Sequence, residues 1–172
     1  MRSLSPARER ARVRRFHQPI FSEQGEQIKL ADEGLRVKVG DKISFTKSVT
    51  HDDLVKFADV TGDTNPIHLD DEYAGKTRFG KRIAHGMLSA GYISTVVGIK
   101  LPQQGETAIY LSQSLRFMRP VFIGDTITTE VEVTAVDAER RRVTLNTVCV
   151  NQNQEQVVTG EALVLLDKYP FS

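Results

Sequence analysis

The sequence is poor in cysteine, in net charge and in long hydrophobic runs, and each shortage excludes a class of protein. Cys149 is the single cysteine among 172 residues, so the chain cannot form an internal disulfide framework, and a reducing compartment is expected. Its 23 basic and 22 acidic residues give a net charge of +1, which offers no general attraction for nucleic acid. No stretch approaches the roughly 18 consecutive apolar residues of a membrane span, and the N-terminus lacks the apolar core of a secretory signal. These absences predict a cytoplasmic protein that binds neither nucleic acid nor membrane.

The first 35 residues differ in composition from the rest of the chain. Residues 1–15 are rich in arginine and contain one acidic residue, Glu9, a bias typical of an organellar transit peptide. A mitochondrial matrix location is therefore the alternative, although Pro6 interrupts any amphipathic helix and favours a plain basic tail. We divide the chain into a polar, arginine-rich N-terminal extension, residues 1–35, and one domain, residues 36–172.

The domain opens with a strand pattern that changes to a helical one. Apolar residues alternate over residues 37–49, which predicts a strand or hairpin arm. Thr50 and Asp53 then have the spacing of a capping box, and Gly62 ends the short helix that follows. Residues 86–99 are almost wholly apolar or small, which predicts a helix buried all round.

Long alternating segments fill the C-terminal half of the chain. They are separated by short polar turns and occupy residues 107–118, 126–136, 142–151 and 156–167. Together with the buried helix they predict an α+β domain in which an antiparallel sheet wraps the helix.

The segment between the two predicted helices contains an acid and an imidazole close together. Pro66 fixes its own φ and pushes Asn65 toward extended conformations. Asp63 and His68 therefore cannot share one regular helix, and a bent loop must join them. Such a loop can aim both side chains at one small volume, although the same residues also suit an ordinary turn.

These motifs resemble those of the MaoC-like (R)-specific enoyl-CoA hydratases and 3-hydroxyacyl thioester dehydratases. The resemblance runs through residues 37–167 and is carried by residues 63–70, 79–87 and 109–125. It implies a hot-dog fold, a long antiparallel β-sheet wrapped around a central buried α-helix, assembled as a homodimer or higher homo-oligomer. The implied reaction is reversible hydration of trans-2-enoyl-CoA to (R)-3-hydroxyacyl-CoA.

The resemblance also implies roles for residues. Asp63 and His68 match the family's catalytic pair, and Gly86 matches the residue whose backbone N–H polarises the thioester carbonyl. A free aspartate is too acidic to be an efficient base near neutrality, so an apolar tunnel is expected around Asp63. Further residues are expected to bind substrate or support the loop: Asn65, Arg82, His85 and Met87.

No cofactor is expected, because adding water across an enoyl thioester needs only a base, an acid and a stabilised oxyanion. No metal is expected either, since the spacing of the four histidines matches no compact zinc motif. Loop arginines and lysines are candidates for the phosphates of coenzyme A or of a carrier-protein arm: Lys76, Arg78, Lys81, Arg82, Arg116 and Arg119. Core packing is the favoured assignment for the aromatic residues Tyr92, Tyr110 and Phe117, and lining of the acyl tunnel is the alternative.

Three other functions use the same fold. A 3-hydroxyacyl-[acyl-carrier-protein] dehydratase of fatty-acid synthesis would run the same chemistry in reverse on a carrier-protein thioester. A hot-dog thioesterase would direct water at the thioester carbonyl instead of the β-carbon, and the Asp63–His68 motif speaks against it. A non-catalytic acyl-thioester binding protein would need neither side chain.

Overall fold

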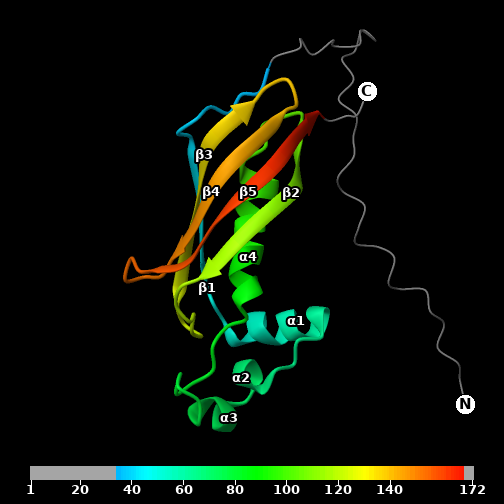
Figure 1. The fold of residues 1–172 in the computed structure, drawn as a ribbon. Helices are drawn as coiled ribbons and strands as arrows, with labels where there is room; N and C mark the ends of the chain where they lie inside the picture. The colour runs from blue at the N-terminus through cyan, green and yellow to red at the C-terminus, as the bar shows by residue number, and fades with distance from the viewer. Residues whose placement is uncertain (1–33, 169–172) are drawn as a thin grey trace, which may run out of the picture. The chain divides into compact units, whose positions relative to one another are not determined.

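A five-stranded antiparallel sheet forms the framework of the domain (Figure 1). The structure is a computed structural model and describes residues 34–168, so the predicted extension lies outside the described residues up to residue 33. The strands are β1 (Lys42–Ser48), β2 (Glu106–Phe117), β3 (Thr126–Asp137), β4 (Arg142–Val150) and β5 (Gln156–Lys168). Their order in the sheet is β1-β3-β4-β5-β2, which leaves β1 and β2 as the outer strands.

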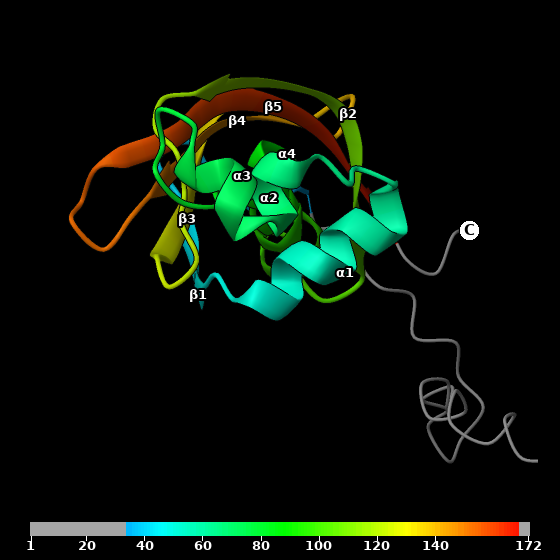
Figure 2. The ribbon, with the colours of Figure 1, turned by 90° about the horizontal axis from the view of Figure 1, so that it is seen from below.

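The helices lie inside the curve of the sheet and at one end of it. They are α1 (His51–Thr61), α2 (Pro66–Leu69), α3 (Asp71–Gly75), α4 (Gly86–Thr95) and the π-helix η1 (Val96–Lys100). Figure 2 shows β2, β5 and β4 arching over α4, with α1, α2 and α3 near its N-terminal end. No helix among residues 34–168 is long and apolar enough to cross a membrane.

The core forms where the central helix meets the inner face of the sheet. Ile93, Val96 and Val97 from the helix are fully buried, as are Val131 and Leu145 from β3 and β4. Removing each such side chain from water contributes about 1.5–3 kcal/mol. This packing fixes the axis of α4, and with it the position of the helix N-terminus.

The first helix begins and ends as the sequence predicts. Thr50 Oγ1 accepts a hydrogen bond from the Asp53 N–H at 3.1 Å, and the Asp53 carboxylate accepts one from the Thr50 N–H at 2.9 Å. This capping box satisfies two N–H groups at the start of α1. Gly62 follows the helix with φ of 76°, a left-handed conformation that favours glycine. The chain leaves α1 in a sharp turn toward Asp63.

The α+β hot-dog class is confirmed, with two differences of detail. The central helix is not buried all round, because Met87 is 55% exposed and Ile99 is 77% exposed. The sheet covers only one side of the helix in a single chain. In addition, the segment after Asp63 contains the short helices α2 and α3, which the sequence did not predict.

Candidate active site

The loop that follows α1 turns into a short helix at Asn65. The Asn65 side chain caps α2 by accepting a hydrogen bond from the Ile67 N–H at 3.2 Å, and Pro66 occupies the first helical position, where no N–H is needed. His68 is therefore presented from α2, whereas Asp63 stays on the loop. Asn65 holds the bend between them, as expected.

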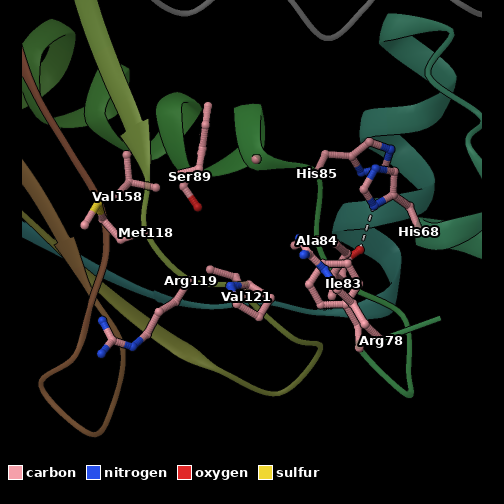
Figure 3. A pocket seen from close by; sticks show the side chains of 14 residues that line it. His68, Arg78, Ile83, Ala84, His85, Ser89, Met118, Arg119, Val121 and Val158 are labelled. Carbon is pink, nitrogen blue, oxygen red and sulfur yellow. Dashed lines mark hydrogen bonds between the residues drawn. The ribbon is translucent and has the colours of Figure 1, made fainter. Parts of the chain in front are cut away.

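His68 is held in one tautomer by the backbone. Its Nδ1 lies 2.8 Å from the Ile83 carbonyl oxygen (Figure 3). A carbonyl oxygen only accepts, so Nδ1 carries the proton and Nε2 keeps a free lone pair. The side chain is half-buried, and this burial lowers the pKa of His68 below its usual 6.5 despite the opposing hydrogen bond to Ile83. His68 is thus a neutral imidazole with a basic Nε2 near neutral pH.

His85 supports both neighbours of this site. It is only 2% exposed, and its Nε2 donates a hydrogen bond to the Asp63 carbonyl oxygen at 2.9 Å. Its ring lies 3.9 Å from the His68 ring, centroid to centroid, and 4.7 Å from the Phe57 ring. His85 therefore fixes the backbone of Asp63 and forms one wall for the His68 imidazole.

Asp63 is brought to the histidines but is not enclosed. One ligand-type atom from each of Asp63, His68 and His85 lies within 4.8 Å of the other two. Asp63 is nevertheless exposed, and its carboxylate accepts a hydrogen bond from the Asn65 N–H at 3.3 Å. The expected apolar tunnel does not surround Asp63 in the single chain, and Asp63 is not among the residues that line the neighbouring cavity.

Gly86 is the first residue of α4, where the helix leaves its backbone N–H groups without intrahelical partners. The positive end of the helix dipole lies at the same place. A Cβ built on Gly86 would lie 2.8 Å from Cε1 of the Phe117 ring, so glycine lets the backbone approach that ring closely. The Gly86 N–H therefore has no partner within the helix, and the Phe117 ring lies close to this residue.

Four consecutive residues connect these groups. The Ile83 carbonyl oxygen binds the His68 ring, and the next residue, Ala84, donates its N–H to the Val121 carbonyl oxygen at 2.7 Å. His85 then binds the Asp63 carbonyl oxygen, and Gly86 begins α4. The segment is tied to the rest of the domain through Val121 and through a bridge between Ile83 and Phe122.

A cavity of about 280 Å³ lies beside these residues. His68, His85 and Gly86 line it together with a mainly apolar wall. Met118 and Val158 lie at the opposite end of the view from His68 (Figure 3). The cavity is close to the lower limit for small-molecule sites, and its composition suits a short acyl group with one polar end.

Some predicted residues lie elsewhere. Arg82 does not line the cavity, because its guanidinium pairs with Asp71 at 2.7 Å and also contacts His51. Met87 is exposed and is not in the cavity wall. Arg78 and Arg119, both among the loop bases singled out from the sequence, do line it.

Core packing holds for one of the three aromatic residues, and the alternative of lining the cavity holds for Phe117. Tyr92 is buried, as expected for core packing, but Tyr110 and Phe117 are exposed, and Phe117 lines the cavity. Both lie on β2, which has no strand on its outer side. Met118 and Val158 were missed, since nothing in an alternating strand pattern separates a cavity wall from core.

The comparisons with known proteins agree with this arrangement. The family model described as MaoC like domain matches residues 35–156. The (R)-specific enoyl-CoA hydratase of Rhodospirillum rubrum is 46% identical over 130 residues, which cover 76% of this chain and 88% of that protein. The mitochondrial 3-hydroxyacyl-[acyl-carrier-protein] dehydratase of Arabidopsis thaliana is 36% identical over 133 residues, covering 76% and 78%. Among solved structures, the (R)-hydratase from A. caviae is 42% identical with a TM-score of 0.72, covering 77% of this chain and 98% of that one.

Proposed function

Because the chain belongs to the MaoC-like domain family, we propose that it is an (R)-specific enoyl-CoA hydratase, a hydro-lyase that adds water to trans-2-enoyl thioesters of coenzyme A. The observation that carries the proposal is a neutral imidazole and a helix N-terminus that line one cavity, with a carboxylate within 4.8 Å of that imidazole. Asp63, His68 and Gly86 supply these groups.

In this proposal Asp63 and His68 hold one water molecule. Its hydrogens point to the Asp63 carboxylate and to Nε2 of His68, and its oxygen adds to the β-carbon of the substrate. The electron pair of the double bond moves toward the thioester carbonyl oxygen, which the Gly86 N–H and the helix dipole stabilise. Nε2 of His68 takes the proton from water and returns it to the α-carbon. The β-carbon gains OH and the α-carbon gains H, so the reaction balances without a cofactor.

We choose a coenzyme A thioester over a carrier-protein thioester as substrate because the chain is more similar in sequence to a coenzyme A hydratase than to a carrier-protein dehydratase. The hydratase of R. rubrum is 46% identical, against 36% for the plant carrier-protein dehydratase. Arg78 and Arg119 line the cavity, and a guanidinium is a good partner for a phosphate. We assign the coenzyme A phosphates to these two residues instead of Arg82, which does not line the cavity; Arg119 would exchange its exposed ion pair with Glu155 for the phosphate.

The direct test is to mix purified protein with crotonyl-CoA, follow the loss of the enoyl thioester absorbance, and determine the chirality of the product. Rapid formation of (R)-3-hydroxybutyryl-CoA is expected. Turnover only of carrier-protein thioesters would favour the dehydratase, and release of free thiol would favour a thioesterase. No turnover of any of these substrates would leave the binding-protein alternative and refute the proposal.

The pH dependence of the reaction should report the lowered pKa of His68. Protonation of Nε2 abolishes its action as a base, and burial moves this event below pH 6.5. We expect the acidic limb of kcat/KM to be centred below pH 6.5. The unfolded chain binds this proton more tightly than the folded chain, so the same group lowers stability as the pH falls below 6.5. An acidic limb centred above pH 6.5 would contradict the assignment of His68 as the base.

We also propose that the protein is a homodimer paired along β2. This strand is an edge of the sheet, and its exposed side chains include Ile109, Tyr110 and Leu111. An exposed apolar edge strand is a template for pairing with another chain. Pairing along β2 would also cover Phe117, the last residue of the strand, which lines the cavity.

Sedimentation equilibrium should therefore give a mass of twice 19.3 kDa. Leu111 lies at a register shift between β2 and β5, so Leu111→Lys should leave the sheet intact while placing like charges at the pairing edge, and we expect a monomer. Val60→Lys, at an exposed apolar residue of α1, is the matched control and should remain a dimer. A monomeric parent protein would refute the pairing.

A further inference from the structure

The hydroxyl group of Ser89 is a polar group in the mainly apolar wall of the cavity. Ser89 belongs to α4 and is only 2% exposed, yet it lines the cavity together with Gly86. In Figure 3 its oxygen points away from the helix, toward the side where Arg119 and Val121 lie. Cavities that bind small molecules use a few such polar groups to fix the orientation of the ligand.

This hydroxyl has no partner in the part of the chain that the structure describes. A serine inside a helix often donates to the carbonyl oxygen four residues earlier, as the Thr95 hydroxyl of α4 does to Gly91 at 3.2 Å. The Ser89 side chain makes no such bond to any residue of the range 34–168, and only its backbone carbonyl oxygen accepts one, from the Cys149 thiol at 3.9 Å. Because buried polar groups are almost always paired, this hydroxyl marks a place for a ligand atom.

Ser89 and Gly86 face the cavity from neighbouring turns of α4. Residues three apart lie on the same face of an α-helix, and among residues 86–90 only these two line the cavity. Helical side chains lean toward the N-terminus, which brings the Ser89 hydroxyl toward the unpaired N–H groups at the start of α4. Two donors that lie about 2.9 Å from one oxygen stand up to roughly 5 Å apart, so both can bind the same ligand atom.

An enoyl thioester offers this hydroxyl few acceptors. The acyl group consists of carbons, which accept no hydrogen bond, and one carbonyl oxygen. Water adds at the β-carbon from the side of Asp63 and His68, so the new hydroxyl of the product forms there. The amides of the coenzyme A arm lie beyond the sulfur. Within the acyl group, the carbonyl oxygen is therefore the acceptor for Ser89.

We propose that Ser89 is a further catalytic residue, whose hydroxyl donates a hydrogen bond to the thioester carbonyl oxygen beside the Gly86 N–H. The role rests on the proposed function. As the oxygen of water bonds to the β-carbon, the double bond shifts to the α-carbon and the carbonyl carbon, and an electron pair moves onto the carbonyl oxygen. Ser89 keeps its proton throughout and stabilises this negative charge as a second donor. The charge disappears when the α-carbon takes the proton from His68.

Two variants remove the strong donor while bracketing the size of serine. Ser89→Ala has a smaller side chain, and Ser89→Cys, studied in reducing buffer, has a larger one with only a weak S–H donor. We expect kcat for crotonyl-CoA hydration to fall about 10²-fold in each, with much less change in KM. Ser44→Ala, the same change at an exposed serine of β1 outside the cavity, is the matched control and should keep the parental kcat. Circular dichroism compares the folds.

A spectroscopic measurement separates donation to the carbonyl from an effect on packing. The conjugated thioester 2,4-hexadienoyl-CoA absorbs at longer wavelength when its carbonyl oxygen is polarised. It is bound to the Asp63→Asn variant, in which hydration is expected to be slow, and to the double variant Asp63→Asn/Ser89→Ala. We expect a red shift of the bound thioester in the first protein and a clearly smaller one in the second.

A fall in kcat of less than about tenfold in Ser89→Ala and Ser89→Cys would overturn the role of Ser89. A raised KM with unchanged kcat would overturn it too, because the hydroxyl would then contribute only to substrate binding. An undiminished red shift in the double variant would overturn the donation to the carbonyl. A red shift that depends on Ser89, in a parent protein that hydrates no thioester, would support the contact and refute the proposed function. The absence of both hydration and a red shift would refute both.

Discussion

Replacing Asp63 by asparagine or His68 by asparagine should each lower kcat for crotonyl-CoA hydration by about 10²–10⁴-fold, the usual contribution of general acid–base catalysis. Asp63→Asn keeps the shape of the side chain but removes its charge. His68→Asn keeps an amide N–H able to replace Nδ1 opposite the Ile83 carbonyl oxygen and removes the basic Nε2. His68→Asn therefore removes the acceptor for the proton of water, and Asp63→Asn removes the charge that orients the water, both with little change in packing.

The double variant tests whether the two residues act on one water molecule. Groups that act as a unit are not additive, so Asp63→Asn/His68→Asn should be about as slow as the slower single variant. His51→Gln, at an exposed histidine that contacts Arg82, serves as the control and should leave kcat unchanged. Stopped-flow absorbance measures all four proteins. A loss of less than about tenfold in either single variant would contradict the shared water.

The second large effect concerns stability and is expected for Gly160→Ala. Gly160 lies on β5, opposite Leu115 of β2 and Thr147 of β4. A Cβ at this position would lie 1.8 Å from the Ser114 carbonyl oxygen, which belongs to the backbone and cannot turn aside as a side chain would. Strand β2 must then move away from β5 and lose part of its hydrogen bonding.

We expect Gly160→Ala to lower the free energy of unfolding by about 3 kcal/mol, the upper part of the usual range for overpacking. In a chain of this size that corresponds to a fall in Tm of roughly 6–12 °C. Gly91→Ala is the matched control, because a Cβ on this helical glycine meets nothing within 4 Å, and alanine favours the helix by up to about 1 kcal/mol. Thermal denaturation followed by circular dichroism compares the two. Similar Tm values for Gly160→Ala and Gly91→Ala would contradict this prediction and show that β2 can move away from β5 with little loss of stability.

The elements with a strong local signal were predicted closely. The alternation over residues 126–136 corresponds to β3 (Thr126–Asp137), and the capping box at Thr50 marks the start of α1. Helices α2 and α3 were not predicted, because they contain four and five residues and a 3.6-residue period needs a longer window to be visible. The exposure of Tyr110 and Phe117 was not predicted either, since it depends on β2 being an outer strand of the sheet.

In the candidate site, too, local features were predicted and contacts between distant residues were not. The bend at Asn65 and Pro66 follows from backbone geometry and was predicted, as was the place of Gly86 at a helix start. The role of its N–H toward the thioester stays a prediction. The bond from His85 to the Asp63 carbonyl joins residues 22 positions apart, and the pairing of Arg82 with Asp71 joins residues 11 apart. Such contacts are set by how α1, α2 and α4 come together, which no local pattern encodes.

The segment 83–86 has a consequence for how this enzyme could diversify. Within four residues it anchors the proposed base, holds the backbone of Asp63 and contains Gly86, the proposed oxyanion donor. An insertion or deletion here would displace all three groups at once, so its length is expected to be invariant. The far wall of the cavity, at Met118 and Val158, contacts none of these anchors through a side-chain hydrogen bond, since both side chains are apolar. Acyl-chain preference could thus drift by single substitutions in the strands while the chemistry stays the same.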